Sequence, residues 1–567
     1  ENRYYGGRCL MGMHSAGRDN VHGREGYATV VTQELARELY KELSTYHDNS
    51  IELNREKIDT PVGSERIEIQ TKLKEAGLVD GSFSLVGKLV EPMCISTKTA
   101  LKKSEMGRQE VFGPCPTAPA VLTTREVNGE RVYPMVNGVK AYQTELVCKD
   151  PKALEPIVNL AMEQHWEQTK HYPRNILTME EAIIPPEHWK MKAINRKTSP
   201  GYKYQKFVTP KTPGKTAFFG HEDEYTMSID NPAYDELRCD VLNIVNWARL
   251  GTRTLHLCTD FLKDELRPLK KVEAVATRVI SGTELDYTIA VRMFFGAFIA
   301  AMFSTHTVNG MAPGINHYKD WAILKEFLTS VGDSVFDGDF SRFDASEQPW
   351  VHEAILDYIE RWYRFNNPEY RESDADVRRV LWLDLVHSRH VTGLGNKLEY
   401  VVQWNKSLPS GHPLTTVVNS MYSLITLTGC YVKSTGDMTD MWSHARINTF
   451  GDDNITGVDE TVRDVFNQVT VAENMKEMFD LTYTPGDKGG VLVPYTTIDN
   501  VTFLKRSFLK DDVACHRLSG RDINVGWVGP LAKESWLYEA YWYKNERSKD
   551  VDIQTRLEHC LCEMCLH

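Results

Sequence analysis

The stretch ARINTFGDDNITGV, residues 445–458, places an acidic turn, FGDDN at 450–454, between two apolar runs that favour strands. Gly451 permits the tight backbone geometry of a turn, so the stretch predicts a β-hairpin with Asp452 and Asp453 at its tip. Hard divalent cations bind through carboxylate oxygens, which makes the tip a candidate metal site. Taken alone, an exposed Asp-rich turn explains these residues equally well.

A second acidic stretch, SVFDGDFSRFDAS at 334–346, makes a metal site more specific. Its apolar run predicts a strand that ends at Asp339, and Asp344 follows further along the chain. Two distant strands that each bring an Asp to one sheet edge form the usual arrangement for two-metal phosphoryl transfer. Asp344 lies too far along the chain to share the metal easily, so we expect it to face the sugar of a substrate. Taken singly, each Asp could instead be a helix N-cap or a turn residue.

Together with five further stretches, these two resemble the ordered motifs of the RNA-dependent RNA polymerase of picornavirus-like positive-strand RNA viruses. The seven are TSPGYKY (198–204) at the template entrance, KDELRPLKKVEAVATRVI (263–280) as the basic fingers motif, and DFSRFD (339–344), PSGHPLTTVVN (409–419), FGDDN (450–454), TYTPGDK (482–488) and VTFLKRSF (501–508) as the palm motifs. The resemblance extends from about residue 85 to the end of the chain. It implies template-directed RNA synthesis from NTPs during viral genome replication.

The resemblance also implies a role for each acidic residue and for one lysine. Asp339 and Asp452 are expected to bridge two Mg²⁺ ions, with Mn²⁺ as an alternative metal, and Asp453 is expected to be a supporting ligand. Lys488, which follows Pro485-Gly486, is expected to be the proton donor to pyrophosphate. An exposed turn lysine is an equally good interpretation of Lys488 without the surrounding motifs.

Nucleotide contacts are expected in the basic motif and in the second palm motif. In 263–280 the basic residues outnumber the acidic ones, which suits a surface facing triphosphate. Ala276 stands where many relatives carry a basic residue, so Lys270 or Lys271 must do more of that work. By resemblance, the nucleotide-binding residues are Arg278, Lys271, Lys263, Asp344, Ser410, Thr415 and Asn419. The last four are expected to read the ribose 2′ hydroxyl, although a locally satisfied helix amide would also explain Asn419.

RNA contacts are expected where small residues let the template backbone approach and where cations can hold primer phosphates. The predicted RNA-binding residues are Thr198, Ser199, Gly201, Lys505 and Arg506. Expected partners are an RNA template and primer, NTPs and other viral replication proteins. Relatives start from a uridylylated peptide, so a VPg-like protein primer is a further candidate partner.

The predicted fold class is α+β, a right-hand polymerase with fingers, palm and thumb and an antiparallel palm sheet. The predicted domains are a protease remnant (1–33), a linker or N-terminal extension (34–84), fingers (85–292), palm with the first motif (293–345), a fingers insertion (346–405), palm with the remaining motifs (406–509) and thumb (510–567). Helices are expected at 151–169, 318–330, 349–364, 414–430, 460–480 and the extreme C-terminus.

The first residues predict a different unit. GMHSAG and GYATVV suggest the last strands of an all-β domain and resemble the end of the chymotrypsin-like cysteine protease that precedes such polymerases. His14 would read the substrate glutamine, but the motif of the nucleophilic Cys is missing, so protease activity is not expected. The chain is expected to be a polyprotein piece, cut at Gln33-Glu34 or elsewhere before residue 85.

Composition narrows the remaining choices. A formal net charge of −12 argues against a protein that coats nucleic acid by bulk positive charge. The 11 Cys, scattered singly except at the C-terminus, favour a reducing compartment, and the expected location is the host cytoplasm, at membrane-associated viral replication complexes. Met293–Phe303, bounded by Arg292, predicts a buried helix that is too short to span a membrane. HCLCEMCLH at 559–567 predicts a thumb helix in preference to a zinc site, and the thumb is short for the family.

Two other functions compete with RNA synthesis on RNA. A reverse transcriptase is disfavoured by Asp344 and Asn419, which would read the ribose hydroxyl. A non-catalytic RNA-binding scaffold would tolerate loss of the three acids, yet Asp339, Asp452 and Asp453 are all present.

Overall fold

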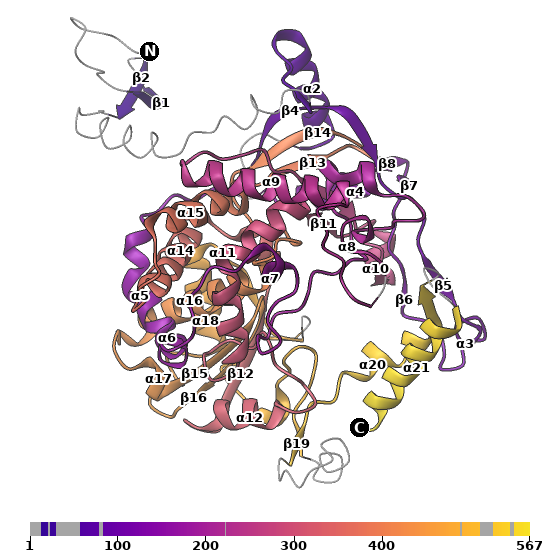
Figure 1. Cartoon of the computed structure of the whole chain (residues 1–567). Coiled ribbons are helices and arrows are strands. Elements are labelled where there is room, and N and C mark those ends of the chain that lie inside the picture. The colour runs from indigo at the N-terminus through magenta and orange to yellow at the C-terminus, as the bar shows by residue number, and fades with distance from the viewer. Residues whose placement is uncertain are drawn as a thin grey trace, which may run out of the picture.

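A four-stranded antiparallel sheet carries both acidic stretches (Figure 1). The computed structural model describes residues 13–20, 23–29, 57–78, 83–143, 145–221, 223–487, 490–510, 526–544 and 549–566. In sheet order, the strands are β15 (Ala445–Phe450), β16 (Asp453–Val458), β12 (Ser334–Phe340) and β17 (Tyr483–Thr484). Phe450 pairs with Asp453 across the turn, and Gly451 has a φ of +64°, so the predicted hairpin and antiparallel palm sheet are confirmed.

Both faces of this palm sheet are covered, because its apolar residues alternate between two cores. Val335 and Ile455 pack with α12 (Trp321–Thr329), whereas Phe336 and Ile447 pack in the large core on the other face. That core includes α11 (Leu285–Ser304), α14 (Pro349–Arg364), α15 (Glu372–Val386), α16 (Thr415–Thr435) and α18 (Gln468–Phe479).

The expected helices are present, with shifted ends. The segment 151–169 is divided into η2 (Pro151–Leu154), α5 (Glu155–Ala161) and α6 (Glu163–Thr169). α18 begins later than expected because the Asn467 side chain accepts hydrogen bonds from the first-turn amides of Val469 and Thr470 and so caps the helix there. α14 has the expected bounds.

α11 contains the expected buried helix but is longer than expected. Arg292 does not interrupt it, because its guanidinium donates hydrogen bonds to the carbonyls of Ala182 (2.6 Å) and Lys192 (2.7 Å). Among the described residues, α11 is the one helix long and apolar enough to cross a membrane by length and composition. Since 72% of its apolar window is buried inside the protein, it has the character of a core helix.

A six-stranded sheet forms the second layer of the structure and joins segments that are far apart in the sequence. Its order is β11 (Val279–Gly282), β9 (Cys258–Leu262), β13 (Arg389–Thr392), β14 (Lys397–Trp404), β4 (Phe83–Cys94) and β3 (Ile58–Asp59). β13 and β14 of the predicted fingers insertion therefore pair with strands of the predicted fingers. In contrast, α14 and α15 of the same insertion pack in the large core with α16.

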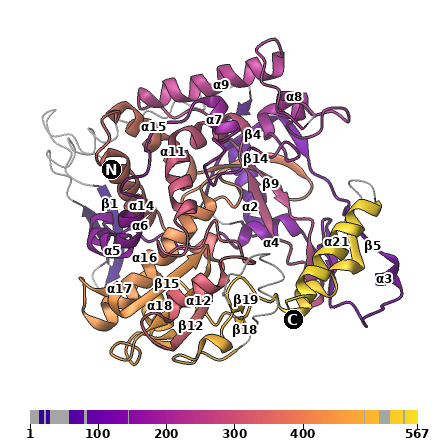
Figure 2. The same ribbon diagram turned by 60° about the horizontal axis from the view of Figure 1, so that its bottom comes forward.

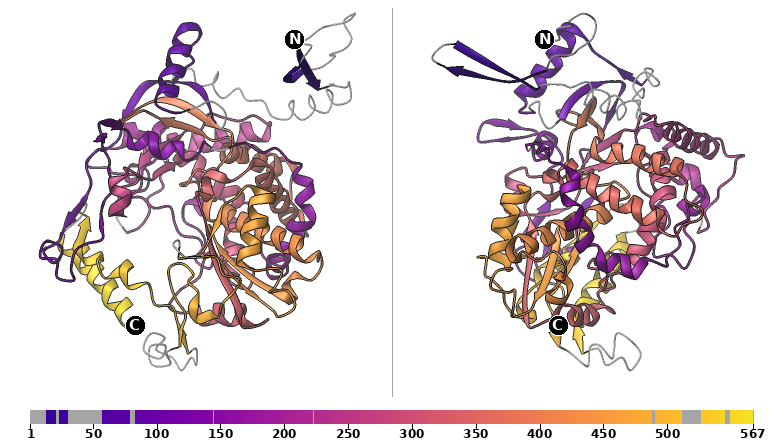
Figure 3. Two further views of the ribbon diagram at one scale, coloured as in Figure 1. Left: turned by 180° about the vertical axis from the view of Figure 1, so that it is seen from behind. Right: turned by 90° about the vertical axis from the view of Figure 1, so that its left-hand side faces the viewer.

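The prediction that the polymerase core begins near Leu85 is wrong. β3 adds the last strand to the six-stranded sheet, and α2 (Gly63–Glu75) lies over that sheet in both views of Figure 3. The side chains of Ile58, Ile69 and Leu73 are buried in its core. α2 exposes most of its charged residues, and this charge pattern is why an exposed linker was predicted. Its two buried residues nevertheless dock the helix on the six-stranded sheet.

The C-terminal segment forms α20 (Lys533–Trp536), β20 (Trp542–Lys544) and α21 (Lys549–Met564), which includes the predicted C-terminal helix. β20 pairs with β5 (Leu101–Lys103), and Figure 2 shows α21 beside β5 and α3 (Glu105–Arg108). Two segments more than 400 residues apart in the sequence thus meet through backbone hydrogen bonds.

At the N-terminus, β1 (Met13–Asn20) and β2 (Gly23–Thr29) form an antiparallel hairpin, with His14 opposite Ala28. The expected strands are present in this part of the chain. The predicted cleavage at Gln33-Glu34 lies outside the described residues, and the protease origin of the hairpin remains a prediction.

Candidate active site

The acidic residues predicted to bind metal lie at one end of the palm sheet. In the antiparallel register of β12 and β16, Gly338 pairs with Asn454, so Asp339 lies one residue further toward the β15–β16 turn that carries Asp452. Asn454 fixes this end of the sheet, because its Nδ2 donates to the carbonyls of Gly338 (3.0 Å) and Asp452 (3.2 Å). The sequence analysis did not single out Asn454.

Gly338 is required by the close approach of Tyr483 from β17. A Cβ at position 338 would lie 2.0 Å from the Tyr483 hydroxyl oxygen, which in turn donates to Asn454 Oδ1 (2.7 Å). The strands β16, β12 and β17 are thereby held together at the end that carries Asp339.

The donor set at this end fits a hard divalent cation. Mg²⁺ is typically held by one or two protein carboxylates, with waters and substrate phosphates completing its shell. Among the described residues no three His, Cys, Asp or Glu side chains are grouped closely enough to form a complete protein cage. Asp339 and Asp452 are therefore the residues that would hold a metal shared with a phosphate substrate, with Asp453 at the start of β16 beside them.

Two of the four residues predicted to recognise ribose meet directly. Asn419 Nδ2 on α16 donates to Asp344 Oδ1 at 2.6 Å. Burial raises the pKa of Asp344, and the Asn419 bond and the charge of Arg278 partly offset that effect. Next to Asn419, the Ser420 hydroxyl accepts the amide of Gly451 (2.9 Å), which ties α16 to the acidic hairpin.

Ser410 belongs to the loop that precedes α16, and Thr415 is the first residue of that helix. The Ser410 hydroxyl accepts the amide of Ser281 (3.2 Å), and the Gly411 amide donates to the carbonyl of Ser281 (3.0 Å). The Thr415 hydroxyl bonds the carbonyls of Pro409 and His412 (both 2.9 Å), so it closes the junction between loop and helix. Its contact with ribose remains a prediction.

The basic motif is organised around one acid. Glu265 forms ion pairs with Arg278, Lys263 (3.5 Å) and Arg267 (3.8 Å). The hydrogen bond to Glu265 raises the pKa of Arg278 most, and the charges of Asp452 and Asp344 raise it further, which places this guanidinium in the field of the acidic site. The sequence analysis missed the organising role of Glu265.

Lys271 and Lys270 lie on α10 (Leu269–Glu273) and are exposed. Neither lysine forms an ion pair with another of the described residues. Both lysines are therefore available to a phosphate ligand, and they can do the work of the basic residue that many relatives carry at the position of Ala276.

A cavity of about 1110 Å³ runs between the template-entrance segment and the acidic hairpin. Its walls include Thr198, Ser199, Ser281, Ser410 and Phe450, so it joins three of the predicted motifs. Lys215, which was not predicted, also lines this cavity: its Nζ bonds the hydroxyl of Thr198 and donates to its carbonyl (3.1 Å). Burial lowers the pKa of Lys215 to about 8.

Gly201 is not among the residues that line that cavity, and its contact with the template remains a prediction. It has a φ of +96°, and a Cβ there would lie 2.7 Å from the backbone of Glu284. The backbone conformation and the close packing both require glycine at this position.

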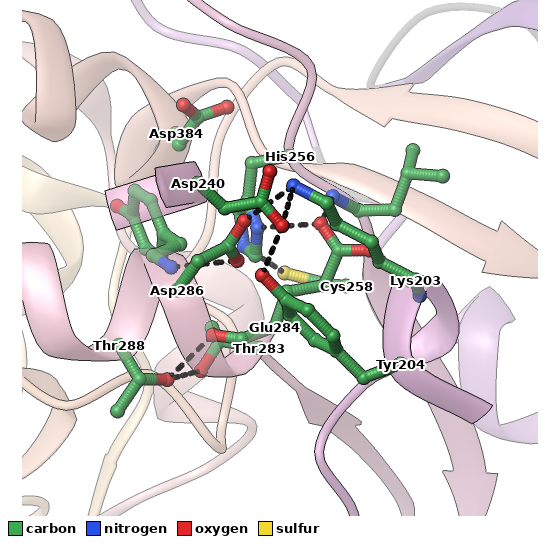
Figure 4. A network of polar contacts seen from close by, with 12 residues as sticks. Lys203, Tyr204, Asp240, His256, Cys258, Thr283, Glu284, Asp286, Thr288 and Asp384 are labelled. Atoms are coloured by element: carbon green, nitrogen blue, oxygen red, sulfur yellow. Dashed lines mark hydrogen bonds and ion pairs between the residues drawn. The ribbon is translucent and has the colours of Figure 1, made fainter. Parts of the chain in front are cut away.

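A buried polar network anchors the segment after Gly201 (Figure 4). Lys203 Nζ pairs with Asp286 (2.8 Å) and Asp240 (2.9 Å), and Asp240 also accepts the Tyr204 hydroxyl (2.7 Å). Burial alone would lower the pKa of Lys203, but the two carboxylates outweigh it and raise the pKa. The template-entrance segment is thus fixed to the start of α11.

The two basic residues of the fifth palm motif have different environments. Lys505 is exposed and could reach a primer. Arg506 is 6% exposed, and its guanidinium forms a two-point contact with Glu563 of α21 (2.6 and 3.0 Å). The prediction that Arg506 grips RNA is therefore wrong, because its donors are turned into the protein. Lys488 lies outside the described residues.

The fold and the site together define a right-hand nucleic-acid polymerase, and comparison with known proteins agrees. The family model described as viral RNA-dependent RNA polymerase matches residues 106–561. The chain is 28% identical to the replicase polyprotein of Acute bee paralysis virus and 30% identical to that of Cricket paralysis virus, over 99% of the chain in each case. It spans 29% and 31% of the lengths of those polyproteins.

A solved structure, the Sicinivirus 3Dpol RNA-dependent RNA polymerase, shares the fold with a TM-score of 0.65 and 22% identity. The match covers 84% of this chain and 93% of that structure. The chain belongs to the viral RNA-dependent RNA polymerase family, whose members are generally metal-dependent enzymes of viral RNA synthesis.

Proposed function

We propose that the chain extends an RNA 3′ hydroxyl on an RNA template by adding nucleotides from NTPs. One observation carries this proposal: Asp339 and Asp452 lie at the same end of the palm sheet, and Asp452 lies in the field of Arg278. The proposed metal is Mg²⁺, with Mn²⁺ as an alternative. When bound by Asp339 and Asp452, it would favour ionisation of the primer hydroxyl and stabilise the leaving pyrophosphate.

The chain's own residues select and orient the substrate. The Asp344–Asn419 pair presents a carboxylate and an amide to the ribose, a pairing that can reject a sugar without a 2′ hydroxyl. Arg278 and the exposed lysines of α10 hold the triphosphate, and the cavity beside Thr198 and Ser199 leads the template to the acids. Lys488 is retained as the proposed proton donor.

The test is Mg²⁺-dependent extension of a primed homopolymer RNA. Asp339→Asn and Asp452→Asn should each abolish nucleotide addition and leave RNA binding largely intact, because metal ligands act in the transition state whereas phosphate contacts hold the template. Asp499→Asn is the matched control, since Asp499 is an exposed palm residue away from the acidic turn. Elongation by either site variant would refute the assignment, and inactivity of the unmodified chain would favour the scaffold alternative.

We also propose that the enzyme works in the host cytoplasm, at membrane-associated replication complexes, with other viral replication proteins and with a VPg-like peptide as primer. The polyprotein relatives support a shared origin with such proteins. For the domain division, we propose fingers from about residue 57 to 292 with the insertion at 346–405, palm at 293–345 and 406–509, and thumb from 510.

A further inference from the structure

A short segment before the Ser410 loop is bonded to the turn that carries Asp344. The Leu408 amide donates to the carbonyl of Asp344 (3.1 Å), and the Ser407 amide donates to that of Glu347 (3.2 Å). The Ser407 hydroxyl adds a third bond, to the carbonyl of Ala345 (3.2 Å). We call residues 406–408 the strap.

The strap holds a strained backbone conformation. Ser407 has a φ of +84°, in the left-handed region that non-glycine residues seldom adopt. Such strain persists only where the surrounding contacts impose it and is commonly found at functional sites. The three bonds to residues 344–347 are the contacts that impose it here.

The strap also carries a buried cation. Lys406 is 1% exposed, and its Nζ has no hydrogen-bond partner among the described residues. Burial lowers the pKa of Lys406 to about 8, and Asp480 and Glu347 act against that shift through their charges. A buried ammonium without a hydrogen bond destabilises a fold, so its presence needs a reason other than stability.

The reason for burying Lys406 lies in its neighbour Glu347. It is fully buried, and its Oε2 lies 2.7 Å from His352 Nε2, while its Oε1 has no partner in the described part of the chain. Burial raises the pKa of Glu347, the charges of Asp344 and Asp452 raise it further, and Lys406 opposes them. Lys406 therefore supplies positive charge beside Glu347, the buried carboxylate at the end of the short helical turn that carries Asp344.

The strap continues directly into the substrate loop. Residues 410 and 411 bond to Ser281, at the end of the strand that follows the basic motif. Asp344, the Ser410 loop and β11 are thus joined through the strap, and a change in the strap would alter their relative positions.

We propose that Lys406 and Ser407 are positioning residues for ribose selection, because the strap holds the Asp344 carboxylate in register with the Ser410 loop. This inference rests on the proposed function. It goes beyond it by assigning specificity to two residues outside the predicted site.

The deciding variant is Lys406→Met, which keeps the length of the side chain and removes the charge. The ratio of kcat/KM for a ribonucleotide to that for its deoxynucleotide should fall about 2- to 30-fold, the range reached by substitutions that act through a neighbour. The loss should come from a raised KM for the ribonucleotide, and the thermal midpoint should stay equal or rise. A merely structural lysine would lower the midpoint and leave the ratio unchanged.

Lys397→Met on β14 is the matched control, since Lys397 is exposed and, among the described residues, forms an ion pair only with the neighbouring Glu399 (2.9 Å). Ser407→Gly is the second variant: glycine accepts the positive φ, but the bond to Ala345 is lost, so the ratio should fall while the fold is retained. An unchanged ratio in Lys406→Met, or in Ser407→Gly if the first variant does not fold, overturns the inference. Absence of RNA synthesis by the unmodified chain overturns the proposed function and this inference with it.

Discussion

Replacing Glu563 by Gln should release the C-terminal helix α21 from the palm. Glu563 is fully buried and accepts four hydrogen bonds from three other parts of the chain. Two come from Arg506 (2.6 and 3.0 Å), one from the Tyr318 hydroxyl (3.1 Å) and one from the Leu531 amide (3.3 Å). The carboxylate thus connects α21 to the fifth palm motif and to the segment before α12.

The magnitude follows from the charge left behind. Glutamine keeps the shape of Glu563 but leaves the guanidinium of Arg506 buried without its anion. Breaking a buried ion pair by removing one partner costs about 3–5 kcal/mol. Local opening of α21 should therefore become about 10²- to 4 × 10³-fold more frequent, at roughly 1.4 kcal/mol for each factor of ten.

Amide hydrogen exchange is the suitable assay, because unfolding of the whole chain need not be two-state. Protection of α21 amides should fall by that factor in Glu563→Gln and in Arg506→Met. Glu558→Gln on the same helix is the control, since Glu558 is exposed and bonds only the neighbouring Gln554 (2.8 Å). Protection within about threefold of the unmodified chain in both test variants would refute the reasoning.

The remaining predictions concern pH, the ribose site and the N-terminus. Burial would raise the pKa of Glu563, but Arg506 outweighs that effect and lowers the pKa. Protection of the α21 amides should therefore be complete above the ordinary Glu pKa of about 4.5 and be lost as pH falls through the lower pKa of the folded state. Hydrogen exchange measured against pH should show this loss, and Glu563→Gln should remove the pH dependence. Asn419→Ala removes the hydrogen bond to the Asp344 carboxylate, which contributes about 1.5–3 kcal/mol. The ratio of kcat/KM for a ribonucleotide to that for its deoxynucleotide should therefore fall about ten- to a hundredfold. An unchanged ratio would show that Asn419 does not take part in sugar selection. A chain beginning at residue 57 should keep the thermal midpoint of the full chain. The thermal midpoint of a chain beginning at residue 85 should be several degrees lower, because that chain lacks the buried side chains of Ile58, Ile69 and Leu73. Equal midpoints for the two chains would contradict the docking of α2.

Local patterns predicted the parts of the site that are built locally. The hairpin at 445–458 follows from alternating apolar residues around a glycine turn, and the Asp344–Asn419 contact follows from two motifs whose roles the resemblance supplied. The hairpin agrees with the structure because neighbouring residues determine strand and turn. The contact between Asp344 and Asn419 joins residues 75 apart in the sequence, and only the resemblance indicated it.

The errors arose where a distant partner decides the environment. The pattern FLKRS predicts a contact with primer phosphates. In the structure, however, Arg506 of this pattern pairs with Glu563, which lies far along the chain. In HCLCEMCLH the cysteines drew attention, yet Glu563 makes the buried contacts. A sequence pattern carries no information about which partner neutralises a charge when the partner lies on another element.

The attachment of the thumb also limits what the Glu563 variant can do. β20 pairs with β5, the Ser104 hydroxyl donates to the carbonyl of Ala540 (2.6 Å), and Trp542 Nε1 donates to Cys115 (3.3 Å). None of these contacts involves Arg506 or Glu563, so different residues make the link between fingers and thumb and the link between palm and thumb. Losing the buried ion pair should therefore loosen α21 while β20 amides keep their protection. If β20 opened together with α21, the two attachments would form one cooperative unit, and the cost assigned to the ion pair would have to be shared between them.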